Sequence, residues 1–169
     1  YYKRHSGSDR ISARVLAKVP IVDEESLYPL EIPSAIQLAC QRGCKEMDRL
    51  QTQITAIKNR LRDFDRFAWP GLEEVFKNIF SPSARFFHRT WYDPFRVLEA
   101  GVDDIQRSCD AFLDQKGDLE WVEALVGLAS EVTQLYGPHA IDYTLLQGEV
   151  CRELDLLAHL EERRLTVWY

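Results

Sequence analysis

The stretch SAIQLACQRGCKEMDRLQTQITAIKNRLRDF, residues 34–64, decides the fold of this chain. Its apolar residues recur at alternating spacings of four and three, which places them on one stripe of an α-helix. The stripe consists of Ile36, Cys40, Gly43, Met47, Leu50, Ile54, Ile57, Leu61 and Phe64. A helix of this length is about 46 Å long. It buries such a stripe only against a partner, so the sequence predicts a coiled-coil arm whose seam runs from Met47 to Phe64.

The rest of the chain is also helical in pattern, and no stretch alternates as a strand does. The last expected helix places Leu146, Val150, Leu154, Leu157 and Glu161 at near-heptad spacing, so it could return antiparallel along the first. The expected helices after residue 71 cover 72–100 (several short ones, with many aromatic residues), 102–115, 119–136 and 141–165. We therefore expect an all-α fold: a long antiparallel helical hairpin, or coiled coil, with a smaller bundle of short helices. The pattern leaves open whether the seam pairs within one chain or across a homodimer.

The N-terminal part differs from this body. A short helix is expected from Asp9 to about Val19, with Ser8 as its cap and Pro20 as its end. Residues 20–33 hold three prolines and an acidic run, which indicates a linker. The predicted organisation is thus a terminal segment 1–19, a linker 20–33 and a helical domain 34–169.

Charge is distributed unevenly along the chain. The 169 residues carry a formal net charge of -6, which argues against uniform electrostatic binding to nucleic acid. Within residues 1–18 the net charge is +4, because five cations accompany a single acid. Phosphate contacts are expected at these cations and at a second basic group in the long helix. The predicted nucleic-acid-binding residues are Lys3, Arg4, Arg10, Arg14, Lys18, Lys58 and Arg62. Arg60 and Arg66 also belong to the second basic group, and Arg85, His88 and Arg89 follow among aromatic residues, an interleaving that can stack on unpaired RNA bases. The aromatic residues Phe86, Phe87, Trp91 and Phe95 are more often core, which is the expectation for them.

Cysteine usage indicates a reducing compartment. The four cysteines, at 40, 44, 109 and 151, form no CxxC pair and no zinc-ligand spacing, so buried reduced thiols are expected. No apolar run approaches the roughly 20 residues that span a membrane, and a cytoplasmic location is expected. The carboxylate pairs Asp63/Asp65 and Asp103/Asp104 are expected to be solvated helix positions.

Three stretches together resemble the insertion sequence 110 family of bacterial transposases. They are HSGSDRISARVLAKVP at 5–20, LYPLEIPSAIQLACQRGCKEMDRLQTQITAIKNRLRDFDRFAWPGLE at 27–73 and SPSARFFHRTWYDPFRVLEAG at 81–101. The resemblance implies an RNA-guided DNA recombinase with a RuvC-like domain, a helical coiled-coil insertion and a domain that carries a nucleophilic serine. On this likeness, residues 1–19 are the tail of the RuvC-like domain and most of 20–169 is the coiled-coil region.

The resemblance also implies a metal role for Asp9. The family's last two acids stand three apart on a helix, followed by alanine, and can share a Mg²⁺ ion. Here Asp9 matches the first acid, Ser12 occupies the second position and Ala13 follows. Serine is a poor substitute for a carboxylate, so it is open whether Mg²⁺ binds in the parent protein. From the residues alone, Asp9 is better explained as a first-turn helix acid.

The sequence leaves two functional hypotheses. The first is an interaction module of a transposase, which pairs protomers and contacts DNA and a structured guide RNA while being catalytically silent by itself. The second is a purely structural helical dimerisation domain without nucleic-acid contact. A complete metal-dependent nuclease would need several acids converging on Asp9, and the sequence suggests none.

Overall fold

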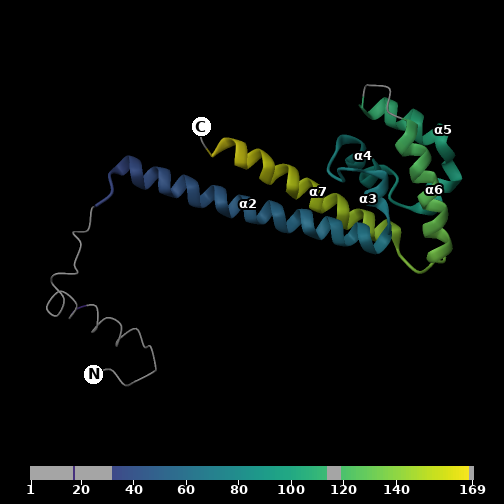
Figure 1. Ribbon diagram of the computed structural model, residues 1–169, viewed down its shortest axis with the longest axis horizontal. Coiled ribbons are helices and arrows are strands. Elements are labelled where there is room, and N and C mark those ends of the chain that lie inside the picture. Colours follow the sequence, from purple (N-terminus) through teal and green to yellow (C-terminus); the bar gives the residue numbers. More distant parts are fainter. Residues whose placement is uncertain (1–16, 18–31, 114–118, 168–169) are drawn as a thin grey trace, which may run out of the picture. The chain divides into compact units, whose positions relative to one another are not determined.

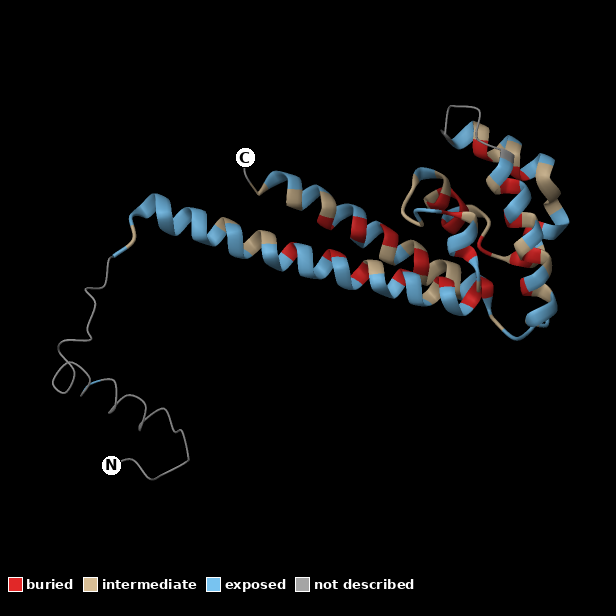
Figure 2. Ribbon diagram, in the orientation of Figure 1, coloured by how far each residue is buried: buried red, intermediate tan, exposed pale blue. Residues whose placement is uncertain are grey.

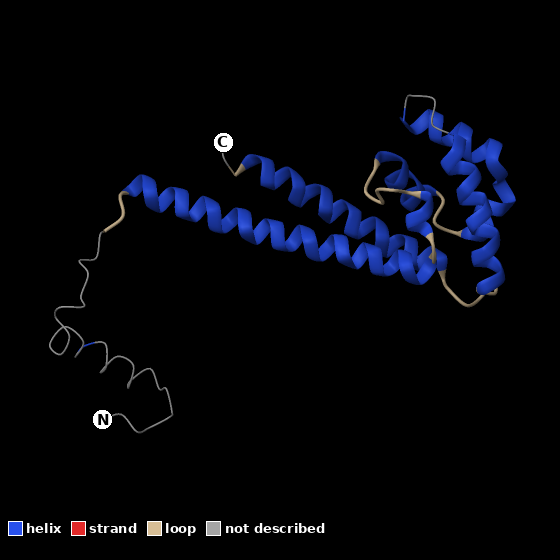
Figure 3. Cartoon of the chain, viewed as in Figure 1, coloured by secondary structure: helices blue, strands red, loops and turns tan. Residues whose placement is uncertain are grey.

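A computed structural model describes residue 17 and residues 32–113 and 119–167 of the chain. Six helices cover most of these residues, and no strand occurs among them (Figures 1 and 3). The expectation of an all-α fold is confirmed. The chain divides into two compact units, Tyr1–Cys40 and Gln41–Tyr169, and the hydrophobic core lies in the second.

The longest helix is α2, Ala35–Ala68, in agreement with the pattern over 34–64. Ser34 and Gln37 cap its start reciprocally. The Gln37 N–H donates to the Ser34 hydroxyl at 3.3 Å, and the Ser34 N–H donates to the Gln37 side-chain oxygen at 2.7 Å. After α2 the chain turns through Gly71, whose φ of 92° is a left-handed conformation that favours glycine.

The last helix, α7 (Tyr143–Thr166), lies antiparallel to α2 (Figure 1). Ion pairs define the direction: Arg163 of α7 lies 3.0 Å from Glu46, and Arg60 pairs with Glu153. Buried residues line the facing sides of both helices (Figure 2). They are Leu50, Ile54, Ile57 and Leu61 of α2 and Val150, Leu154, Leu157 and Leu160 of α7. The centre of the predicted seam is therefore buried within one chain.

The ends of the predicted stripe are less buried than its centre. Met47 and Phe64 are half-buried, whereas Ile36 is 77% exposed. Cys40 and Cys44 are exposed as well, so the expectation of buried thiols is wrong for these two. Cys44 precedes Glu46, where the last turns of α7 meet α2, and it therefore lacks the cover that the seam receives. Cys109 is buried and Cys151 half-buried, as expected.

The smaller bundle consists of α3 (Leu72–Val75), α4 (Pro82–Thr90), α5 (Pro94–Leu113) and α6 (Leu119–Leu135). Ser81 caps α4 by accepting a hydrogen bond from the Ala84 N–H at 3.2 Å, and Pro82 occupies the first helical position. Helix α5 packs along α6 (Figure 1) and is interrupted at Gly101, where φ is 71° and ψ is -179°. That conformation is accessible almost only to glycine.

An aromatic core joins the end of α2 to this bundle. Trp69, Phe87 and Tyr92 are fully buried, and the Trp69 and Phe87 rings meet edge to face at 5.1 Å. The Trp69 indole N–H donates to the Tyr92 carbonyl oxygen at 2.9 Å, so this large ring buries no unpaired donor. The expectation that the aromatic residues after 72 form core is met most fully by Phe86 and Phe87, while Trp91 and Phe95 are half-buried.

Candidate nucleic-acid interface

The N-terminal candidates lie outside the described residues. This applies to the predicted catalytic and metal-binding Asp9, to Ser12, and to the predicted phosphate-binding residues Lys3, Arg4, Arg10, Arg14 and Lys18. The roles assigned to them stay predictions. The candidates that the structure does describe belong to α2 and α4.

Lys58 and Arg62 of α2, the two described candidates, converge on one aromatic ring. The Lys58 ammonium lies 5.2 Å from the centroid of Phe80, and the Arg62 guanidinium lies 5.4 Å from it. Both distances are within the range of cation–π attraction. Arg62 also donates to the side-chain oxygen of Asn59 at 3.2 Å, and its side chain stays exposed. Phe80 thus gathers two cations that stand one helical turn apart.

Arg85 of α4 and Glu161 of α7 complete this group. Arg85 donates to the Phe80 carbonyl oxygen and to the Glu161 carboxylate, both at 3.1 Å, and Lys58 lies 3.0 Å from the same carboxylate. Although burial opposes it, hydrogen bonding to Lys58 and Arg85 holds the pKa of Glu161 below its ordinary value. We call Lys58, Arg62, Phe80, Arg85 and Glu161 the Phe80 cluster. Its three cations exceed its one carboxylate by two charges.

Other basic residues of the same region do not join the cluster. Arg60 and Arg89 pair with Glu153 and Asp155 of α7, respectively. Arg66 is exposed and lies 4.0 Å from Asp63. The interleaving of basic and aromatic residues indicated such a site in the sequence. Nothing in the pattern separated Phe80 from the other aromatic rings or assigned Glu161 to it.

A second polar group lies beneath the surface. Asp65 is 4% exposed and His88 1% exposed, and the Nε2 atom of His88 lies 2.9 and 3.0 Å from the two carboxylate oxygens. The Tyr92 hydroxyl donates to the same carboxylate at 3.1 Å. The expectation that Asp65 is solvated is therefore wrong. A histidine 23 residues away supplies the partner that allows this carboxylate to be buried.

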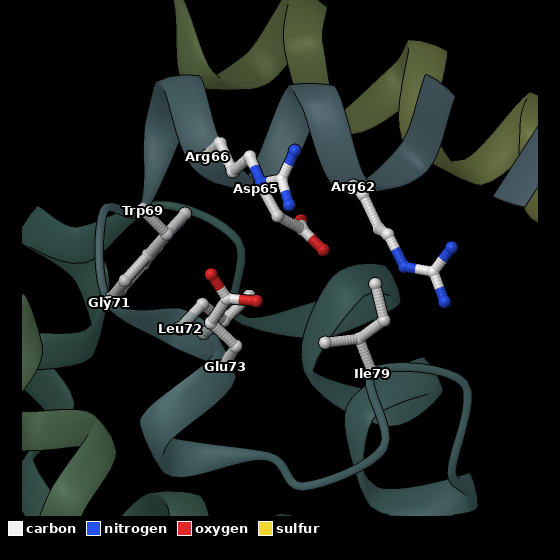
Figure 4. Close-up of a pocket in the computed structure, with 8 residues that line it drawn as sticks. All are labelled: Arg62, Asp65, Arg66, Trp69, Gly71, Leu72, Glu73 and Ile79. Carbon is white, nitrogen blue, oxygen red and sulfur yellow. The ribbon is translucent and has the colours of Figure 1, made fainter. Parts of the chain in front are cut away.

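A small pocket adjoins Asp65 (Figure 4). It is lined by Arg62, Asp65, Arg66, Trp69, Gly71, Leu72, Glu73 and Ile79, and its volume is about 30 Å³. This space suits an ordered water and is too small for a nucleobase. The cations of Arg62 and Arg66 in its lining are balanced by the carboxylates of Asp65 and Glu73, so the pocket offers a phosphate no excess of positive charge. The exposed guanidinium of Arg62 outside the pocket is the better candidate for an anion contact.

No family model, curated protein or solved structure matches this chain. Among the described residues, no group of three or more histidine, cysteine or acidic side chains is placed to hold a metal ion. No helix in the described part of the chain has both the length and the apolar character needed to cross a membrane.

Proposed function

We propose that this chain is a helical module of a DNA transposase and that its Phe80 cluster binds the phosphate backbone of nucleic acid. Two independent features support the proposal. The three quoted stretches resemble the insertion sequence 110 family, and the cluster gathers positive charge in a chain whose net charge is -6. The observation that carries the proposal is the convergence of Lys58, Arg62 and Arg85 on one ring.

The chemistry of the cluster suits phosphate recognition. Arg62 offers a planar fork of N–H donors that matches two phosphate oxygens, and it is held on a ring rather than in an ion pair. Lys58 and Arg85 share Glu161, so a phosphate would compete with that carboxylate for them. The main contact is therefore expected from Arg62, with the other two cations supporting it.

The proposal assigns the remaining tasks to the whole transposase. The helical pair of α2 and α7 would hold neighbouring domains apart, and protomers would pair in a homo-oligomer on DNA and a structured guide RNA. Any Mg²⁺ would be held by Asp9 together with acids outside this chain. The described helices then contribute positioning and nucleic-acid affinity rather than a chemical step.

Salt-dependent binding tests the proposal. The experiment compares the wild-type chain with Arg62→Glu and with the control Arg107→Glu. Each protein is titrated with duplex DNA and with a structured RNA from the sequences that flank the insertion element. Each lost phosphate contact lowers the slope of log K against log salt by roughly 1. We expect this loss for Arg62→Glu with at least one nucleic acid. Arg107 is 79% exposed and pairs with Asp104 of the same helix, away from the Phe80 cluster, so its reversal should have the smaller effect. Equal effects of the two reversals, or no binding by the wild type, would contradict the proposal.

A second candidate function is helical dimerisation without nucleic-acid contact. It is favoured by the exposure of Ile36 and Cys40, which lie one turn apart on the same face of α2; Ile36 is 77% exposed. Exposed apolar residues that share one helix face suit a protein partner. Sedimentation equilibrium with and without RNA distinguishes the candidates. A dimer that ignores RNA supports the second, whereas RNA binding that weakens steeply with salt supports the first.

A further inference from the structure

The imidazole of His88 faces a hydrogen-bond acceptor on both sides. Its Nδ1 atom lies 2.6 Å from the Ala84 carbonyl oxygen, and its Nε2 atom lies 2.9 Å from an oxygen of Asp65. Neither acceptor can donate a proton to the ring, given an ionised carboxylate. A neutral imidazole has a single N–H and would leave one nitrogen lone pair against an oxygen. The geometry therefore requires a proton on each ring nitrogen.

The groups around His88 are consistent with an imidazolium paired to a carboxylate. Asp65 supplies the negative charge from α2, and the neutral Tyr92 hydroxyl donates to it from the segment after α4. Burial, reinforced by Asp65, raises the pKa of Tyr92 well above its usual value, so this phenol keeps its proton. The Asp65 carboxylate thus accepts hydrogen bonds from His88 and Tyr92, and its negative charge lies between them.

Helix α7 brings uncharged side chains to His88 and Tyr92. From α7, Gln147 donates to the His88 carbonyl oxygen at 3.3 Å, and the Cys151 thiol approaches the same oxygen at 4.0 Å. Burial is the main factor that raises the pKa of the Cys151 thiol, which keeps it neutral. The α7 residue Tyr143 is neutral as well, since burial raises its pKa to about 12. Next to His88 on α4, Arg89 is paired with Asp155 of α7.

We propose that doubly protonated His88 is a proton-dependent clamp that holds α4 on α2 and thereby keeps Arg85 in the Phe80 cluster. Arg85 precedes His88 by less than one helical turn on the nine-residue α4, so the two side chains move with the same short helix. A regulatory role of the clamp rests on the proposed function. In that role, phosphate binding by the Phe80 cluster would depend on whether the buried imidazole carries one proton or two. The clamp itself does not depend on that function.

The two acceptors also determine what the loss of a ring proton costs. When His88 loses a proton, either Ala84 loses its donor or Asp65 becomes a buried charge without a counter-ion, and both are costly. The unfolded chain suffers neither loss. Loss of a proton from the ring of folded His88 therefore weakens the clamp.

The first test observes the ring directly in the wild-type chain. With ¹⁵N-histidine labelling at neutral pH, NMR should show His88 with two protonated nitrogens, and the exposed His159 provides the comparison within the same chain. A neutral tautomer at His88 in the folded protein would overturn the clamp. This measurement requires no variant and no nucleic acid.

The second test asks whether the clamp positions Arg85. In His88→Gln the pKa of Glu161 should rise relative to wild type, because one of the two cations that lower it is displaced. The matched control His159→Gln should leave the Glu161 pKa unchanged. An unchanged value in a folded His88→Gln protein would overturn the positional link; if that variant fails to fold, the milder Asp65→Asn is read out in the same way. If both tests succeed but no nucleic acid binds, the clamp stands and the proposed function fails.

Discussion

Arg163 and Glu46 form an ion pair of 3.0 Å although 117 residues separate them in the chain. The contact brings the last turns of α7 to α2 near its twelfth residue and so defines the antiparallel arrangement of the two helices. Its energetic contribution is small, because both side chains are partly solvated. The arrangement is stabilised mainly by the apolar residues between the two helices.

Removing one of these apolar residues should destabilise the folded chain rather than separate subunits. Leu50 is fully buried, so Leu50→Ala is expected to lower the free energy of unfolding by roughly 2–5 kcal/mol. Urea denaturation measures the loss, and the exposed Gln53→Ala serves as the control. A Leu50→Ala protein that stays equally stable but becomes monomeric from a dimer would show instead that the seam pairs two chains.

Two glycine substitutions should change stability in opposite directions. Gly101 adopts a φ of 71°, so Gly101→Ala is expected to cost about 1–3 kcal/mol although a Cβ would meet no atom within 4 Å. Gly127 lies within α6, also in open space, so Gly127→Ala should stabilise by up to about 1 kcal/mol. Thermal unfolding of both variants checks the pair. Equal shifts would mean that α5 is not interrupted at Gly101 in solution.

Glu161 should make the stability of the chain sensitive to acid. Its pKa is lower in the folded than in the unfolded chain, so its stabilisation is present above the unfolded pKa and is lost as the pH falls through the folded one. The free energy of unfolding of wild type should therefore fall more steeply in acid than that of Glu161→Gln. The neighbouring exposed Glu162→Gln provides the comparison and should follow wild type. Parallel curves for all three would show that Lys58 and Arg85 do not hold this carboxylate in solution.

Tyr143 should make the stability of the chain sensitive to alkali. Burial is the main cause that raises its pKa to about 12, and its hydroxyl donates to the Ala68 carbonyl oxygen at 3.2 Å. A raised pKa of an acid stabilises the fold below the unfolded pKa, and this contribution is lost as the pH rises towards about 12. Tyr143→Phe removes the donor and should cost about 1 kcal/mol near neutral pH. It should also remove one late ionisation from the ultraviolet titration of the tyrosines.

The helices could be predicted because their information is local. The spacing from Ile36 to Phe64 predicted α2 within a few residues, and the spacing from Leu146 to Glu161 predicted α7. A repeat of apolar positions indicates which side of a helix is buried. It does not indicate whether the helix that covers this side belongs to the same chain or to a second copy. The packing of Leu50 within one chain therefore became visible only in the structure.

The buried polar group could not be predicted in the same way. Asp65 directly follows a seam residue in a charged stretch, where a carboxylate normally faces water. Its burial depends on His88 and Tyr92, which reach it only after the chain has turned back through Gly71. The Phe80 cluster has the same origin, since it combines two helices and a loop with a carboxylate from the far end of the chain.

The position of Arg62 on Phe80 has a consequence for the entropy of association. A freely rotating arginine side chain forfeits about 2 kcal/mol of rotational freedom when it is immobilised. Contact with the ring removes part of that freedom before any ligand is present. An anion that approaches the N–H edge of this guanidinium would meet donors that are already partly ordered, so less of its binding free energy would be spent on ordering them. A ring without any charge thus prepares the cation beside it for an anion.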